Sequence, residues 1–183
     1  PATASTTPYP FGVHPLRQGL IMLSLNDGQY AHLFAYLPDD VEADATLPLT
    51  RITSGPWNDT SPSLSQDGKM LAFASDRSGY WDLYLLELAT GLVTRLTDTL
   101  EYEGFPSWSP DGVWITYEMY VNENLEIFIS PIDGSQPPIR LTDNSAADYS
   151  PAWSPWGRQI AFISNRAGNA DVWLANLDQV DEK

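Results

Sequence analysis

Short apolar runs separated by polar turns follow one another along most of this chain. Between residues 105 and 142 these runs cover 105–109, 113–119, 125–130 and 138–142. Turns rich in Pro, Asp and Gly lie between the runs, and Gly suits a turn because it adopts positive φ without steric cost. Positions 113–119 alternate enough to give two faces, and no window keeps a 3.6-residue period. The pattern predicts four β-strands in this stretch and few helices anywhere.

The same pattern recurs along the chain with a period of 44 or 45 residues. A proline near the start of the first strand, followed by a turn that ends in Gly, appears at 61–68, 105–112 and 150–157. A second landmark, Arg followed by Ile or Leu and then Thr, recurs in phase at 51–53, 95–97 and 140–142. Four antiparallel strands per repeat of about 40 to 45 residues are typical of a β-propeller blade. A two-sheet sandwich is the competing all-β fold, but it does not require the same turn at a fixed spacing.

These periods predict an all-β fold: a β-propeller of about four four-stranded antiparallel blade units, with the terminal units incomplete. The units span about 19–53, 60–97, 105–142 and 150–177, and they contribute three, four, four and three strands, 14 in all. Residues 1–18 are expected to form an N-terminal linker or arm, and residues 19–183 the propeller segment. Open blades leave strand edges that need partners. The arm could supply a strand, two chains could pair as a homodimer, or further repeats could complete the ring.

Composition narrows the classes of partner. Apolar residues make up 43% of the chain and aromatic residues 12%, which favours a folded core over disorder. The formal net charge of -15 repels a phosphate backbone, so nucleic acid is not expected as a partner. Cations, basic peptides and neutral partners stay open, and so does the simpler interpretation that the charge only keeps the surface soluble. No run approaches 18 apolar residues, so membrane insertion is not expected either.

The first residues bear on localisation. Residues 1–8 form a tract of Pro, Thr, Ser and Ala. Such tracts often connect an export signal or a lipid anchor to a domain outside the cytoplasm. We therefore expect an extracytoplasmic protein, periplasmic, secreted or surface-anchored, although an arbitrary chain boundary would look the same.

The sequence offers no recognisable set of catalytic groups. There is no Cys, so disulfides, thiolate metal sites and a Cys nucleophile are excluded. Neither His14 nor His32 sits in a cluster of ligands with metal spacing. No Gly-x-Ser-x-Gly elbow and no glycine-rich phosphate loop occurs. We expect no catalytic residue, no metal, no cofactor and no enzymatic activity of this chain alone.

One constellation stands out as a candidate ligand site. A carboxylate lies three positions before each repeated proline, at Asp59, Glu103 and Asp148, and aromatic residues stand beside these carboxylates, at Trp57, Tyr102 and Tyr149. In a propeller, equivalent positions on innermost strands form a ring at the channel. Three carboxylates there would attract a cation or a basic side chain, and the aromatic rings would add cation–π contact. The alternative is that each carboxylate only caps its own loop by accepting backbone N–H bonds.

The remaining arginine and tryptophan motifs are expected to have structural or surface roles. Arg77 in the loop before Asp82, and Arg166 before Asp171, are expected to pair with those carboxylates within one blade. Trp108 and Trp153 are expected to pack between blades, whereas Trp81 and Trp156 stand on turns and are candidates for exposed contact.

The motifs of the repeat resemble a known family. Pro-x-Trp-Ser-Pro-Asp-Gly at 106–112, Ser-Asp-Arg-x-Gly at 75–79, Asp-Leu-Tyr at 82–84 and Arg-Leu-Thr at 95–97 together resemble the TolB-type β-propeller repeat. The resemblance covers roughly 19–177, with Gln66 and Trp156 replacing motif residues and the Ser-Asp-Arg-x-Gly element missing at 119–124. The motif is specific for the fold and not for a function. The repeat, together with the absence of a catalytic set, leads us to expect a binding scaffold for a protein or ligand without catalysis of its own, and a purely structural spacer in an envelope protein is a further alternative. The same repeat also occurs in the propellers of prolyl-oligopeptidase-like and tricorn-like proteases, so a substrate-gating part of a larger protease is the alternative.

Overall fold

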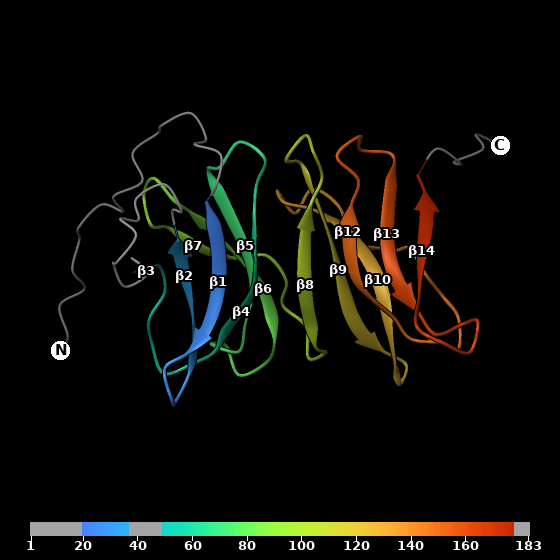
Figure 1. The fold of residues 1–183 in the computed structure, drawn as a ribbon, viewed down its shortest axis with the longest axis horizontal. Coiled ribbons are helices and arrows are strands. Elements are labelled where there is room, and N and C mark those ends of the chain that lie inside the picture. The colour runs from blue at the N-terminus through green and yellow to red at the C-terminus, as the bar shows by residue number, and fades with distance from the viewer. Residues whose placement is uncertain (1–19, 37–48, 178–183) are drawn as a thin grey trace, which may run out of the picture.

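The computed structural model describes residues 20–36 and 49–177, which form four antiparallel sheets without any helix (Figure 1). The first sheet contains β1 (Ile21–Asn26), β2 (Ala31–Tyr36) and β3 (Leu49–Arg51). The second contains β4 (Asp59–Leu64), β5 (Met70–Ser75), β6 (Asp82–Glu87) and β7 (Val93–Arg95). The third contains β8 (Glu103–Trp108), β9 (Trp114–Val121), β10 (Asn124–Pro131) and β11 (Ile139–Arg140). The fourth contains β12 (Asp148–Trp153), β13 (Gln159–Ser164) and β14 (Asp171–Asn176).

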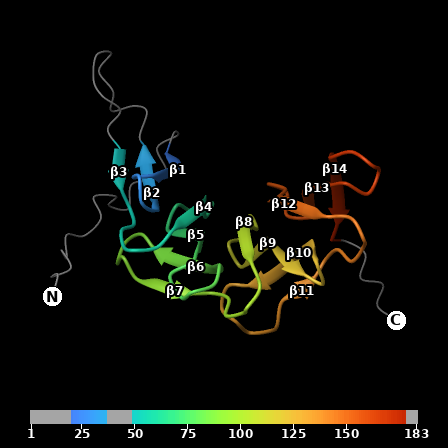
Figure 2. The ribbon, with the colours of Figure 1, turned by 90° about the horizontal axis from the view of Figure 1, so that it is seen from below.

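The four sheets stand side by side in an arc, as the blades of a propeller do (Figure 2). We call them blades 1 to 4 in chain order. The strands β4, β8 and β12 line the concave side of the arc, and β3, β7 and β11 lie toward its outside (Figure 2). The predicted fold class and the predicted 14 strands, grouped as three, four, four and three, are confirmed for the described residues.

The core lies between neighbouring blades. On β5, Leu71 and Phe73 belong to a cluster with residues of blade 1, whereas Ala72 and Ala74 belong to a second cluster with Trp108 and other residues of blade 3. Alternate positions of one strand therefore face two different blades, as the period of two dictates. This is why the middle strands are apolar at nearly every position, and why one blade cannot bury its faces alone.

The repeated turn has the backbone that its glycine predicts. Gly68, Gly112 and Gly157 have φ values of 70°, 71° and 83°. In the middle turn, Gly112 N–H donates to the Ser109 carbonyl at 3.0 Å, and Asp111 accepts from Ser109 Oγ and from Val113 N–H. The turn survives where Trp156 replaces the usual Asp, because Gly157 keeps the positive φ.

Of the four predicted tryptophan environments, two are confirmed and one is wrong, while Trp153 lies between blades 3 and 4 as predicted but is only half-buried. Trp108 is 8% exposed and packs between blades 2 and 3, and Trp156 is 87% exposed, both as predicted. Trp81, expected on the surface, is half-buried because its indole packs against the cluster between blades 2 and 3 and meets Tyr102 edge-on at 6.4 Å.

Some predictions fall on residues that are not described. The expected arm at 1–18, with His14, lies outside the described residues, and so do the acidic loop at 38–47 and residues 178–183. Within the part of the chain that the structure describes, no helix is long and apolar enough to cross a membrane.

Candidate functional site

Each innermost strand bulges at its repeated proline. The ladder between the first and second strand of a blade shifts register between Thr60 and Ser63, between Gly104 and Ser107, and between Tyr149 and Ala152. The residue before each proline has positive φ, with values of 51° for Ser61, 51° for Phe105 and 52° for Ser150. A bulge leaves its extra residues outside the ladder and re-aims their side chains.

These backbone conformations are unusual for the residues that adopt them. Left-handed φ is uncommon for a non-glycine residue and is an outlier for one as bulky as Phe105. Such a conformation costs on the order of 1–3 kcal/mol, and it persists only where the surrounding structure enforces it. Strain of this kind concentrates at functional sites. Its repetition on β4, β8 and β12 makes the concave side of the arc a candidate site.

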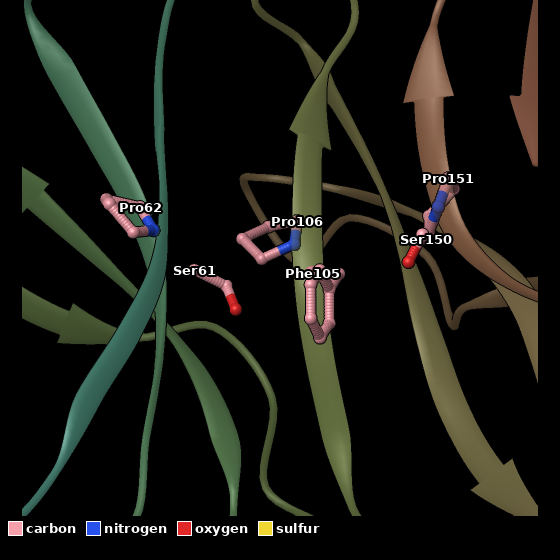
Figure 3. A pocket seen from close by; sticks show the side chains of 6 residues that line it. All are labelled: Ser61, Pro62, Phe105, Pro106, Ser150 and Pro151. Carbon is pink, nitrogen blue, oxygen red and sulfur yellow. The ribbon is translucent and has the colours of Figure 1, made fainter. Parts of the chain in front are cut away.

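The bulged residues meet at a common hollow. A hollow of about 160 Å³ is lined by three pairs of consecutive residues from β4, β8 and β12 (Figure 3). The pairs are Ser61–Pro62, Phe105–Pro106 and Ser150–Pro151. We call these six residues the pre-proline ring. Phe105 is 45% exposed, so the ring offers one accessible aromatic face between two serines.

Hydrogen bonds between blades hold the backbone around the ring. Ser24 Oγ donates to the Asp59 carbonyl at 2.9 Å, and Trp108 Nε1 donates to the Ser63 carbonyl at 2.8 Å. Ser150 N–H, inside the ring, donates to Glu118 Oε2 of blade 3 at 2.7 Å. Neighbouring blades thus hold Ser150 within the ring and the backbone on both sides of Ser61, which favours a preorganised surface.

The predicted carboxylates lie at the base of the ring strands and are fully buried. Asp59 accepts a hydrogen bond from Arg77 Nη2 at 2.6 Å, and Asp148 accepts one from Arg166 Nη2 at 2.6 Å. The guanidinium of Arg77 lies 5.2 Å from the ring centre of Trp57, one of the predicted aromatic residues. In blades 2 and 4 the carboxylate therefore neutralises an arginine of its own blade, within a stack of aromatic rings.

The pairing expected for Arg77 with Asp82 is wrong. Ser75 lies between the two carboxylates, opposite Asp59 on one side and opposite Asp82 on the other. Arg77 turns to the Asp59 side, while Asp82 accepts from Arg95 Nη2 at 2.7 Å. For Arg166 the partner is likewise Asp148, and Asp171 is exposed. The order of residues along the chain could not predict these pairs, because each arginine binds a carboxylate on the innermost strand, 18 residues earlier in the sequence.

Glu103 has a different environment. Val121 stands where Arg77 and Arg166 stand in the other blades, two residues after the position paired with the carboxylate. Glu103 accepts from Thr99 Oγ1 at 3.1 Å, and its Oε2 has no hydrogen-bond partner among the described residues. Burial raises the pKa of the Glu103 carboxyl to about 7. Blade 3 thus holds a buried carboxyl group that binds its proton more tightly than an ordinary glutamate does.

Tyr102 and Tyr149, the other predicted aromatic residues, are both half-buried. Tyr102 Oη donates to Glu118 Oε1 at 3.3 Å, and burial together with this carboxylate raises the pKa of the Tyr102 phenol. Burial also raises the pKa of Glu118. Glu118 also accepts from Ser150 N–H, so the Glu118 side chain connects Tyr102 to the pre-proline ring.

The described residues contain no cluster of metal ligands. Among residues 20–36 and 49–177, no group of three or more His, Asp or Glu side chains is placed to hold a metal ion. His32 is 1% exposed, and its Nε2 lies 3.4 Å from Asp27 Oδ2, at the first turn of blade 1.

Comparison with known proteins supports the repeat assignment. A family model described as the TolB beta propeller domain matches residues 82–182. The Tol-Pal system protein TolB of Francisella tularensis is 31% identical over 150 residues, which are 82% of this chain and 34% of that protein. The chain therefore spans about a third of the length of this relative.

One solved structure and one further sequence relative are also similar to this chain. The crystal structure of TolB from Acinetobacter baumannii matches with a TM-score of 0.77 at 24% identity, over 88% of this chain and 40% of that one. The uncharacterized peptidase YuxL of Bacillus subtilis is 27% identical over 155 residues, 71% of this chain and 24% of that protein.

Proposed function

This chain belongs to the TolB β-propeller family, and from that premise we propose that it is a non-catalytic binding segment whose pre-proline ring receives a side chain of a protein partner. The protein acts outside the cytoplasm. Support for that location comes from the Pro/Thr/Ser tract at 1–8 and from relatives that belong to the Tol-Pal system.

The observation that carries the proposal is the repetition of strained bulges on three adjacent innermost strands. Equivalent positions on innermost strands converge at the channel of any propeller, so the bulges favour binding because they present the accessible ring of Phe105 between Ser61 and Ser150 at this hollow. The hollow of about 160 Å³ suits one inserted side chain better than a whole small-molecule ligand, since such pockets usually measure roughly 300–1,000 Å³.

The ring offers a mixed set of contacts. Phe105 supplies an apolar face, and Ser61 and Ser150 supply hydroxyl groups on either side. Three carboxylates begin the innermost strands, and they act as positioning residues and not as ligands because all three are fully buried. They are Asp59, Glu103 and Asp148. A partner segment with an apolar anchor flanked by hydrogen-bonding groups fits this surface.

Site-specific photo-crosslinking tests the proposal. A photoreactive phenylalanine analogue at position 105 of the full-length protein should form a discrete adduct in cells. The same analogue at Leu92, which is 59% exposed on an outer turn, is the matched control. A second substitution, Ser150→Trp, should fill the hollow and abolish the adduct. Equal adducts from positions 92 and 105, or an adduct that survives Ser150→Trp, would contradict the proposal.

A second function is favoured by a separate observation. The likeness to the peptidase YuxL supports a role as the substrate-gating propeller of a larger peptidase. The reading frame around this chain distinguishes the two: a hydrolase domain with a Gly-x-Ser-x-Gly elbow supports the peptidase, and further propeller repeats alone support the binding scaffold.

A further inference from the structure

A second hollow lies between blades 3 and 4, away from the pre-proline ring. It measures about 580 Å³, a size usual for ligand sites. It opens beside the turns that join the first and second strands of these blades, where β9 and β12 lie side by side (Figure 1, Figure 2). Its lining includes Trp114 from β9, Trp153 from β12 and Trp156 from the following turn. Three of the seven tryptophans of the chain thus surround one hollow.

The repeat provides an internal comparison for these tryptophans. At the corresponding positions between blades 2 and 3, Met70 stands in place of Trp114 and Asp111 in place of Trp156. Only the place of Trp153 is occupied by a tryptophan there too, Trp108. The two additional indoles are therefore features of this interface and not of the repeat.

The indole of Trp156 has little packing role. It is 87% exposed, whereas the structural Trp108 is 8% exposed. The turn that carries Trp156 is nevertheless well held, because Trp153 Nε1 donates to the Gly157 carbonyl at 3.1 Å. The neighbouring turn lies close by, since a Cβ atom placed at Gly157 would be 3.9 Å from Cγ of Pro110. An exposed indole on a fixed turn is available for contact with a ligand.

The charge of the hollow is negative. Among the described residues that line it, Asp111 is the one with a charged side chain, and no lysine or arginine is present. Asp111 uses Oδ1 for Ser109 Oγ and Val113 N–H, and these bonds lower the pKa of its carboxyl group. Aromatic faces and a carboxylate together favour an organic cation, through cation–π contact and charge pairing. The net charge of -15 attracts the same class of ligand to the molecule.

A smaller hollow adjoins this one on the side of the innermost strands. It measures about 330 Å³, is lined among others by Ser63, Ser107 and Trp108, and shares Ser109, Pro110 and Trp153 with the larger hollow. We call these two adjoining hollows the track; their lining residues run from the innermost strands β4 and β8 to β11 on the outer side. A track of this shape suits an extended polypeptide better than an isolated small cation.

We propose that this track binds an extended segment of a basic partner protein, with a lysine or arginine side chain held between Trp114, Trp153 and Trp156 beside Asp111. The site is separate from the pre-proline ring, and its test does not depend on whether the ring binds a partner.

Indole N–H signals in nuclear magnetic resonance spectra of the ¹⁵N-labelled 183-residue chain report binding here directly, with Val172→Lys and Leu174→Lys introduced to suppress association through the exposed β14 edge. The probe is the peptide acetyl-Ala-Pro-Arg-Pro-Ala-amide, and the matched peptide contains citrulline, the neutral isostere, in place of arginine. We expect the signals of Trp114, Trp153 and Trp156 to shift, with a dissociation constant in the range of roughly 1 mM. The citrulline peptide should bind at least about fivefold more weakly, because it lacks the cation.

Variants locate the site. Trp156→Ala and Asp111→Asn should each weaken binding about fivefold. Tyr80→Ala, which removes another exposed aromatic ring, and Asp133→Asn, in a comparable turn of blade 3, should leave binding unchanged. Circular dichroism spectra verify that each variant is folded. Equal affinity for the citrulline peptide, shifts confined to Trp57, Trp81 or Trp173, or no shift at roughly 20 mM peptide would each overturn the proposal.

Discussion

Replacing Glu103 by Gln should make the protein more stable at alkaline pH, although the substitution removes a buried carboxylate. Glu103 is fully buried, and its blade has Val121 where the other blades have the arginine that neutralises the carboxylate. Ionisation therefore leaves a poorly compensated charge in the blade, and the pKa of the group rises from 4.5 to about 7.

The sign and size of the effect follow from linkage. The folded state binds this proton more tightly than the unfolded state, so the stabilisation is complete below pH 4.5 and is lost as the pH rises through about 7. The shift corresponds to about 3 kcal/mol of unfolding free energy between these limits. Glutamine stays neutral at all pH values. The variant should match the wild type near pH 4 and exceed its unfolding free energy by up to about 3 kcal/mol at pH 8.

Urea denaturation at pH values from 4 to 8 measures this difference. Glu118 also has a raised pKa and adds to the pH dependence of the wild type, but it is present in both proteins and cancels in the comparison. Asp148→Asn is the control, because it removes the partner of Arg166 and should destabilise the protein by about 3 kcal/mol at pH 8. A Glu103→Gln variant that is less stable than the wild type at pH 8, or a difference that does not change with pH, would refute the reasoning.

Two further predictions concern a turn and an exposed edge. Gly112→Val should lower the unfolding free energy by at least about 1 kcal/mol, because a β-branched residue resists the observed φ of 71° even though a Cβ meets no atom within 4 Å. An unchanged melting temperature would contradict it. Val172 and Leu174 on β14 are 74% and 60% exposed, so the isolated chain should self-associate, and Val172→Lys with Leu174→Lys should prevent this. Light scattering decides, and a wild-type chain that stays monomeric at high concentration would refute the prediction.

The strand order was predictable because two landmarks recur in phase. The prolines of the turn motif and the Arg-(Ile/Leu)-Thr element define the blade period, and the glycines of the turns define the hairpins. The exposure of Trp156 was predictable because the repeats align it with Asp111, at a turn position that is usually polar.

Features that depend on contacts between strands were not predictable. The sequence distance from Arg77 to Asp82 is short, but register places Arg77 nearer Asp59. The left-handed conformation of Ser61, Phe105 and Ser150 carries no glycine signal, because the bulge is imposed by neighbouring strands and not by local preference. The proline that recurs at the same place in each period was the available clue.

The affinity of the captured partner for ring variants tests the central claim most directly. The partner identified through position 105 should bind Phe105→Ser at least about tenfold more weakly than the wild type, since loss of a central aromatic anchor commonly costs more than about 1.4 kcal/mol. Leu92→Ser, an equally drastic change at an outer turn that is 59% exposed, should bind like the wild type. Isothermal titration calorimetry with the full-length protein provides both values. Unchanged affinity of the Phe105→Ser variant, or an equal loss with Leu92→Ser, would contradict the account.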